Sequence, residues 1–271
     1  MIPTIVYLNG EFLPEGKAVI PVTDRGFLFG DGVFTTIRIQ EGHPEFLEQH
    51  LQKLVQDCEL LGIVPPRISE ENIHDLIRKN GADSGVWRLK IILSGGNSPE
   101  LNLSKRSLGQ LLMTLKPYGV SSSPCRLTVY PYPYNTPFGG IKSLAYLDRL
   151  RIADYAKKHG FDDALVLNYE GIMLETSIAN LFWKVGQEVF YPDTSLSLYN
   201  GVTLQVLLGA MEKMDLKSWP VKAKLEEIPR DAQVFMCNSM KGFVPVISIG
   251  TKEFKRDLEF ESNLRELSFG I

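Results

Sequence analysis

Short β-branched strands closed by tight turns alternate with amphipathic helical stretches along this chain, and that alternation constrains the fold most. Residues 4–12 (TIVYLNGEF) predict two strands joined by an Asn-Gly turn at Asn9 and Gly10. Residues 33–43 (VFTTIRIQEGH) alternate and end in a glycine turn, which predicts another strand. Residues 44–63 place apolar side chains at helical spacing. Hairpins mixed with helices in this way predict an α+β fold rather than a doubly wound parallel sheet.

The length of the chain predicts more than one domain. At 271 residues it exceeds the usual size of a single domain. Residues 119–125 (GVSSSPC) interrupt the pattern with small, turn-forming side chains and predict a linker. We therefore expect a small N-terminal α+β domain over residues 1–118 and a larger C-terminal α+β domain over residues 126–271.

Composition argues against several classes of partner. The net charge is −3 without a basic block, which disfavours nucleic acid. Apolar runs stay well short of the ~18 residues that would cross a membrane, and the first residues lack the pattern of a signal peptide. The three cysteines lie far apart without a CxxC pair, which disfavours a disulfide framework or a metal site. We expect a cytoplasmic protein with no nucleic-acid, membrane or metal partner.

Lys142 lies at an unusual place for a lysine. Residues 143–158 predict a helix with Ser143 as its N-cap and with Leu147 and Leu150 turned inward. The positive end of the helix dipole and apolar neighbours would both favour the neutral amine of Lys142. A neutral amine is a nucleophile toward aldehydes. The alternative is a lysine that caps a turn and extends its ammonium group to water.

Glu175 and two candidate anion-binding segments provide complementary features. Glu175 lies in a strand-like segment, residues 172–183, and a buried carboxylate there needs a cation or a donor such as a pyridinium ring. Gly201 leads a predicted helix whose first amides, at Val202 and Thr203, suit a phosphate, and residues 237–242 (CNSMKG) offer another loop of amides. The alternatives are an edge-strand acid facing water, an ordinary helix start and an ordinary turn.

Six blocks together resemble the fold-type IV pyridoxal-phosphate enzymes, which include branched-chain and D-amino acid aminotransferases and aminodeoxychorismate lyases. The blocks cover nearly the whole chain: DRGFLFGDGVFTTIR (24–38), HLQKL (50–54), IKSL (141–144), DDALVLNYEGIMLETSIANLFW (162–183), NGVT (200–203) and CNSM (237–240). The resemblance implies a two-domain, D-amino acid aminotransferase-like fold with pyridoxal 5′-phosphate between the domains, in a homodimer. The glycine-rich residues 26–32 lack the strand-to-helix context of a dinucleotide loop.

The resemblance also implies roles for individual residues. Lys142 would hold the cofactor aldehyde and later move the proton, and Glu175 would hold the pyridine nitrogen. The phosphate would lie against a set of amides and side chains: Val202, Thr203, Asn238, Ser239 and Lys53. At position 53 the family usually has an arginine, and lysine supplies the charge without the bidentate fork.

The stretch GDGVFTTIR looks most like the lyases, which convert 4-amino-4-deoxychorismate to 4-aminobenzoate and pyruvate for folate synthesis. In that reading Thr36 donates a proton to the departing pyruvate fragment, and Lys90 and Arg38 contact the small-molecule amino substrate. Gly95 stands where lyases often have an arginine, which leaves carboxylate recognition open. The alternatives are an aminotransferase for D-amino or branched-chain amino acids, and a cofactor-binding protein without catalysis. For Thr36 the alternative is a plain strand residue.

Overall fold

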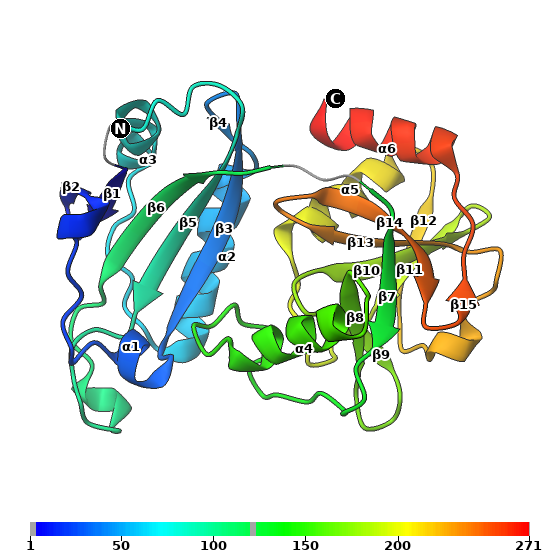
Figure 1. Ribbon diagram of the computed structural model, residues 1–271, viewed down its shortest axis with the longest axis horizontal. Helices are drawn as coiled ribbons and strands as arrows, with labels where there is room; N and C mark the ends of the chain where they lie inside the picture. The colour runs from blue at the N-terminus through cyan, green and yellow to red at the C-terminus, as the bar shows by residue number, and fades with distance from the viewer. Residues whose placement is uncertain (1–3, 120–122, 271) are drawn as a thin grey trace. The chain divides into compact units, whose positions relative to one another are not determined.

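The computed structural model describes residues 4–119 and 123–270, and these divide into two compact units. The first unit combines the described residues up to 119 with residues 141–146, and the second combines residues 123–140 with 147–270 (Figure 1). Residues 120–122 of the predicted linker lie outside the described residues. Cys125, assigned to the same linker, instead begins strand β7. The first unit is thus built from two separate stretches of sequence.

The first unit is an antiparallel sheet of six strands. Their order across the sheet is β2 (Glu11–Pro14), β1 (Ile5–Leu8), β6 (Leu111–Pro117), β5 (Val86–Ser94), β3 (Gly32–Gln40) and β4 (His43–Pro44). The predicted turn at Asn9 and Gly10 is confirmed, because Leu8 pairs directly with Glu11 and both turn residues have positive φ. An Asn-Gly pair adopts this left-handed backbone with little strain, which fixes the register of the hairpin.

Two helices, α2 (Leu47–Leu61) and α3 (Glu70–Lys79), cover one face of this sheet (Figure 1). Val33, Ile37 and Ile39 of β3 point toward them and are fully buried in a common apolar core. The alternate residues of β3 are Phe34, Thr36 and Arg38, and they point to the opposite face because side chains alternate along a strand. That second face carries the candidate substrate residues.

The second unit is a nine-stranded mixed sheet. The strands run in the order β12 (Lys217–Val221), β11 (Glu188–Pro192), β10 (Asn180–Val185), β13 (Gln233–Asn238), β14 (Gly242–Ile249), β7 (Cys125–Val129), β8 (Asp163–Leu167) and β9 (Met173–Thr176), with β15 (Lys252–Glu253) beside β14. One face forms an apolar core of its own. The other face is covered by α5 (Val202–Glu212) and α6 (Leu258–Phe269), and by α4 (Leu147–Lys158) over β8 and β9.

Two predictions about the helix after Lys142 are wrong. The helix α4 begins at Leu147 rather than at Ser143. Residues 142–144 are extended beside β3 instead, where the Leu144 amide donates to the Gly32 carbonyl and the Phe34 amide donates to the Lys142 carbonyl, both at 2.9 Å. The side chain of Leu147 is 69% exposed, and Leu150 is 60% exposed. The buried face of α4 is instead formed by Ile152 and Ala156.

The glycine-rich residues 26–32 make room for this extended segment. A Cβ on Gly32 would lie 2.6 Å from the Leu144 side chain and 2.5 Å from the Leu93 carbonyl oxygen. Gly30 has a φ of +67°, and its Cβ would lie 2.9 Å from the Ala145 backbone. Real Cβ atoms do not approach that closely, so these glycines are required by packing. Within the same stretch a short helix, α1 (Arg25–Phe29), begins at Asp24 and was not predicted.

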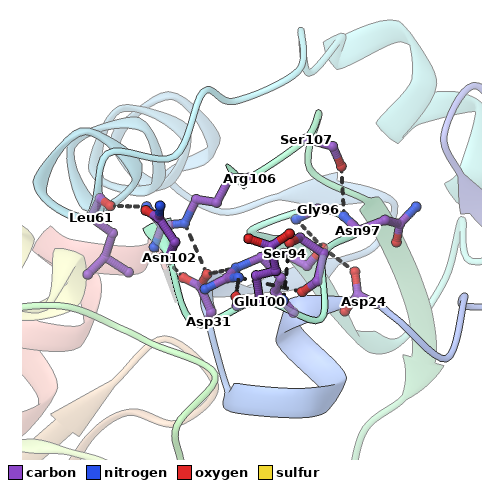
Figure 2. A network of polar contacts seen from close by, with 12 residues as sticks. Asp24, Asp31, Leu61, Ser94, Gly96, Asn97, Glu100, Asn102, Arg106 and Ser107 are labelled. Carbon is purple, nitrogen blue, oxygen red and sulfur yellow. Dashed lines mark hydrogen bonds and ion pairs between the residues drawn. The ribbon is translucent and has the colours of Figure 1, made fainter. Parts of the chain in front are cut away.

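A buried ionic network supports the loop between β5 and β6 (Figure 2). Asp31 accepts hydrogen bonds from Arg25 at 2.6 Å and from Arg106 at 2.5 Å, and Arg106 also bonds the carbonyl of Leu61. Burial alone would raise the pKa of Asp31, but the hydrogen bonds and charges of Arg106 and Arg25 together outweigh it and lower the pKa. A Cβ on Gly95 would lie 2.5 Å from the Asp31 carboxylate, so any larger residue here would have to displace the group that Arg25 and Arg106 hold.

Among the described residues no helix is both long and apolar enough to cross a membrane, and the three cysteines are buried without a disulfide.

We predict that Asp31→Asn destabilises the protein by about 3 kcal/mol, because it leaves two arginines without their shared carboxylate. The measurement is urea unfolding at pH 7. Since the folded pKa of Asp31 is lowered, its contribution is present above the unfolded pKa and is lost as the pH falls through the folded pKa. Glu15→Gln is the matched control, because the Glu15–Lys116 pair is exposed and should contribute less than about 1 kcal/mol. Equal losses in the two variants would contradict the prediction.

Candidate active site

The backbone of Lys142 is held from two directions in the first unit. Its amide donates to the Asp57 carboxylate at 3.2 Å, and its carbonyl accepts from Phe34. Asp57 is 1% exposed and also forms an ion pair with Lys53, four residues earlier on α2. A buried carboxylate needs such a cation. Lys53 therefore contributes to the placement of Lys142 through its ion pair with Asp57.

The Lys142 side chain shares the ring of Phe34 with a second amine. Its Nζ lies 5.1 Å from the centroid of this ring, and the Nζ of Lys90 lies 4.3 Å from the same centroid. Burial lowers the pKa of Lys90, and the charge of Arg88 lowers it further. Thr36 pairs with Lys90 across β3 and β5, so both point to this face. Three predicted site residues are thus brought together around Phe34.

Arg38 lies on the same face, two residues beyond Thr36. It is 7% exposed and donates through Nη2 to Gln40 at 2.7 Å. Its Nε is buried without a hydrogen-bond partner in the described part of the chain, with the nearest carboxylate oxygen, on Glu45, 3.7 Å away. Arg88 pairs with Arg38 on the neighbouring strand. This sheet face therefore carries enough positive charge to bind a carboxylate-bearing ligand.

His50 was not among the predicted site residues. It lies on α2 one turn before Lys53, is 5% exposed, and bonds the Thr35 hydroxyl through Nδ1 at 2.9 Å. Burial, and then the charge of Lys142, lower the pKa of His50 to about 4, so the ring is neutral at physiological pH. The spacing of His50, Lys53 and Asp57 on one helical face was the signal that could have revealed them, because these polar residues share a face with buried Leu54.

Glu175 belongs to a buried cluster in the second unit. It lies one residue before the end of β9 and is 3% exposed, so it does not face water although β9 is at the edge of the sheet. Its Oε1 accepts from Arg149 at 2.5 Å and from the Tyr199 amide at 3.2 Å. Arg149 was missed because the predicted face of α4 was wrong, and no local pattern in the sequence marks its contact with Glu175.

The predicted phosphate residues also lie in the second unit. Helix α5 begins after Gly201, and no side chain caps its start. The amides of Val202 and Thr203, in its first turn, have no acceptor within the helix. Asn180 holds this terminus by accepting from the Gly201 amide at 3.1 Å and donating to the Tyr199 carbonyl. Asn180 pairs with Cys237 across β10 and β13, and the next residue, Asn238, accepts from the amides of Met240 and Lys241 through Oδ1.

These residues fit pyridoxal 5′-phosphate. The uncapped terminus of α5 has the charge that a phosphate requires, and the buried Glu175 carboxylate suits a protonated ring nitrogen. Lys142 supplies a partly buried primary amine. One argument for Lys142 is nevertheless wrong: because α4 starts five residues later, the helix dipole does not act on this amine. No cluster of metal-ligating side chains occurs within residues 4–119 and 123–270.

Comparison with known proteins identifies the family. The model of the class IV aminotransferases matches residues 32–249, so the chain belongs to this family. An aminodeoxychorismate lyase of Bacillus subtilis is 28% identical over 260 residues, which cover 90% of this chain and 86% of that protein. A Methanocaldococcus jannaschii protein assigned as a branched-chain-amino-acid aminotransferase is 26% identical over 256 residues, covering 90% and 87%.

A solved structure confirms the predicted fold. The branched-chain aminotransferase of Thermoproteus uzoniensis superimposes with a TM-score of 0.89 at 20% identity, covering 97% of this chain and 93% of that one. The α+β fold of the fold-type IV enzymes, predicted from the six sequence blocks, is therefore confirmed.

We predict that His50 makes the stability of the cofactor-free protein sensitive to mild acid. Its pKa of about 4 in the folded state lies below the ordinary value of 6.5, so the unfolded chain takes up the proton first. The contribution is full above pH 6.5 and falls by about 3 kcal/mol as the pH drops to 4. Urea unfolding at pH 7.5 and 4.5 measures it. His50→Gln should flatten this dependence, while His159→Gln, at an exposed histidine, should not; a profile unchanged by His50→Gln would contradict the prediction.

Proposed function

We propose that this protein is a lyase that converts 4-amino-4-deoxychorismate to 4-aminobenzoate and pyruvate. The observation that carries the proposal is the sheet face on which Thr36, Lys90 and Arg38 lie next to Lys142. The substrate has two carboxylates, and the cations of this face suit such a dianion. The 28% identity to the Bacillus subtilis lyase supports the same reaction.

Pyridoxal 5′-phosphate is the cofactor, and when bound it supplies an electron sink that stabilises negative charge on the substrate. Lys142 holds it through Nζ. Glu175 holds its ring nitrogen, and the first amides of α5, with Ser239 and the Asn238 loop, hold its phosphate. Lys53 supports Lys142 through Asp57 and remains our candidate for the phosphate as well.

The protein residues then move two protons. The Nζ of Lys142, once released, removes a proton from the substrate ring. The ring becomes aromatic as its bond to the pyruvate oxygen breaks, and the hydroxyl of Thr36 delivers a proton to the departing fragment. One proton leaves the substrate and one enters pyruvate, so the reaction needs no oxidant or reductant. Lys90 and Arg38 hold the carboxylates during this exchange.

An aminotransferase for D-amino or branched-chain amino acids is the second candidate. The Methanocaldococcus jannaschii relative favours it, because its 26% identity is close to the 28% of the lyase. Both candidates use the same lysine, so only the substrate separates them. A protein that binds the cofactor without turnover is the third candidate.

Two further expectations belong to this proposal. We propose that the protein acts in the cytoplasm as a homodimer. The exposed apolar side chains of Val22 and Phe27, 79% and 75% exposed, support a partner surface on the first unit.

The choice among the three functions is tested by offering the purified, cofactor-loaded protein 4-amino-4-deoxychorismate, and separately D-alanine or L-leucine with 2-oxoglutarate. We expect fluorescent 4-aminobenzoate from the first. Lys142→Ala should reduce this rate at least about 10³-fold and abolish the cofactor adduct trapped by borohydride. Lys157→Ala, at an exposed lysine of α4, should keep both. Keto-acid turnover without aminobenzoate would favour the aminotransferase, and a yellow but inert protein would favour a binding role.

Thr36 gives a sharper test of the lyase chemistry. We expect Thr36→Val, which removes the hydroxyl but keeps the branched shape, to lower kcat for aminobenzoate formation about 10²-fold. Thr36→Ser should retain most of the rate because it keeps the hydroxyl. A fully active Thr36→Val enzyme would remove the proton-donor role and leave Thr36 as an ordinary strand residue.

A further inference from the structure

We propose that Arg149 is a positioning residue that fixes the Glu175 carboxylate and limits how strongly this carboxylate holds a proton on the cofactor's ring nitrogen. This inference rests on the proposed function, in which Glu175 pairs with that nitrogen.

Three contacts fix the Arg149 side chain. Its Nη2 lies 2.5 Å from Glu175 Oε1, and its Nη1 donates to the Thr176 carbonyl at 3.0 Å. The guanidinium carbon lies 4.9 Å from the centroid of the Tyr134 ring. The side chains of Arg149 and Glu175 are only 12% and 4% exposed. A guanidinium held by a carboxylate, a carbonyl and an aromatic ring has little freedom to leave its partner.

The Glu175 carboxylate is correspondingly fixed. Its Oε1 takes hydrogen bonds from Arg149 and from the Tyr199 amide, which approach from α4 and from the segment before α5. A nearby positive charge and two hydrogen-bond donors are the partners that a carboxylate anion requires when it is buried. Arg149 therefore holds in place the carboxylate that would pair with a protonated ring nitrogen.

The same positive charge works against the ring proton. A guanidinium close to the carboxylate would also be near a ring nitrogen bound by that carboxylate, and like charges repel. With an effective dielectric constant of about 20, a charge about 6–8 Å away moves a titration by about one to two pH units. Arg149 should therefore make the ring nitrogen lose its proton at a lower pH than an unpaired glutamate would allow.

Two further titratable groups on neighbouring segments, Tyr134 and Asp163, carry no positive charge. Tyr134 remains a neutral phenol because burial raises its pKa, with smaller effects from Arg149, Glu175 and Asp148. Asp163 on β8 bonds the Ser177 amide, and burial raises its pKa. Arg149, with Nη2 2.5 Å from Glu175 Oε1, brings a positive charge to this carboxylate.

The test uses the full-length protein loaded with pyridoxal 5′-phosphate that carries ¹⁵N in its ring. The ¹⁵N chemical shift, followed against pH, reports directly where the ring nitrogen loses its proton and does not depend on turnover. The variants are Arg149→Gln and Arg149→Lys. Arg151→Gln is the matched control, because Arg151 lies two residues further along α4 and is exposed.

We expect the midpoint in Arg149→Gln to rise by about one to two pH units, and the midpoint in Arg149→Lys to stay near that of the wild type. Arg151→Gln should leave it unchanged. If Arg149→Gln does not fold, Arg149→Met replaces it as the variant without the charge and is compared with Arg149→Lys in the presence of excess cofactor. The proposal is overturned if every folded variant without the charge has the wild-type midpoint.

A second measurement separates this inference from the proposed function. The ratio of dissociation constants for pyridoxal 5′-phosphate and its analogue with carbon in place of the ring nitrogen isolates the contact with Glu175. Arg149→Gln should raise the preference for the natural cofactor about tenfold, and Glu175→Gln should abolish that effect. A wild-type protein that binds no cofactor overturns both proposals. Cofactor binding with an unmoved titration and an unmoved ratio overturns the role of Arg149 alone.

Discussion

The extended contact between residues 142–144 and the first residues of β3 determines the geometry of the first unit. Two backbone hydrogen bonds, from Phe34 to Lys142 and from Leu144 to Gly32, join these segments. The Asp57 carboxylate holds the Lys142 amide from the other side. Because hydrogen bonds fix the backbone of Lys142, its Cα stays in place while the side-chain amine changes partner. Gly30 and Gly32 supply the space that this contact needs.

Because side chains alternate along a strand, β3 has its core residues on one face and its candidate substrate residues on the other. Val33, Ile37 and Ile39 stabilise the unit by packing against α2 and α3. Phe34, Thr36 and Arg38 point away from that core and meet Lys90 and Arg88 from β5. A one-residue shift in register would exchange the two sets, so burial of the apolar set fixes where the polar set points. The core therefore places the candidate substrate residues without contacting a substrate.

The sequence predicted the parts of the molecule whose signals are local. The Asn9-Gly10 turn, strand β3 and helix α2 follow from turn chemistry and hydrophobic period. The predicted start of α4 was wrong because Ser143 and the following leucines have a helical pattern. Residues 142–144 instead form hydrogen bonds with β3, which lies about 110 residues earlier in the chain. Arg149 acquires its role only through such a tertiary contact, which no window of sequence contains, whereas the spacing of His50 and Asp57 along α2 was a local signal. The roles of Lys142 and Glu175 were predicted only through the resemblance, since each alone favoured an ordinary surface residue.

The construction of the first unit from two stretches has a consequence for synthesis on the ribosome. When residues up to 119 have emerged, the edge of β3 at Val33 and Phe34 still lacks its backbone partner, which arrives only with residues 142–144. An unpaired strand edge is a template for association with other chains. The nascent protein must therefore pass through a stage with this edge open, and the arrival of residues 142–144 both closes the edge and brings in the side chain of Lys142. Closure of the sheet edge and placement of Lys142 are the same event.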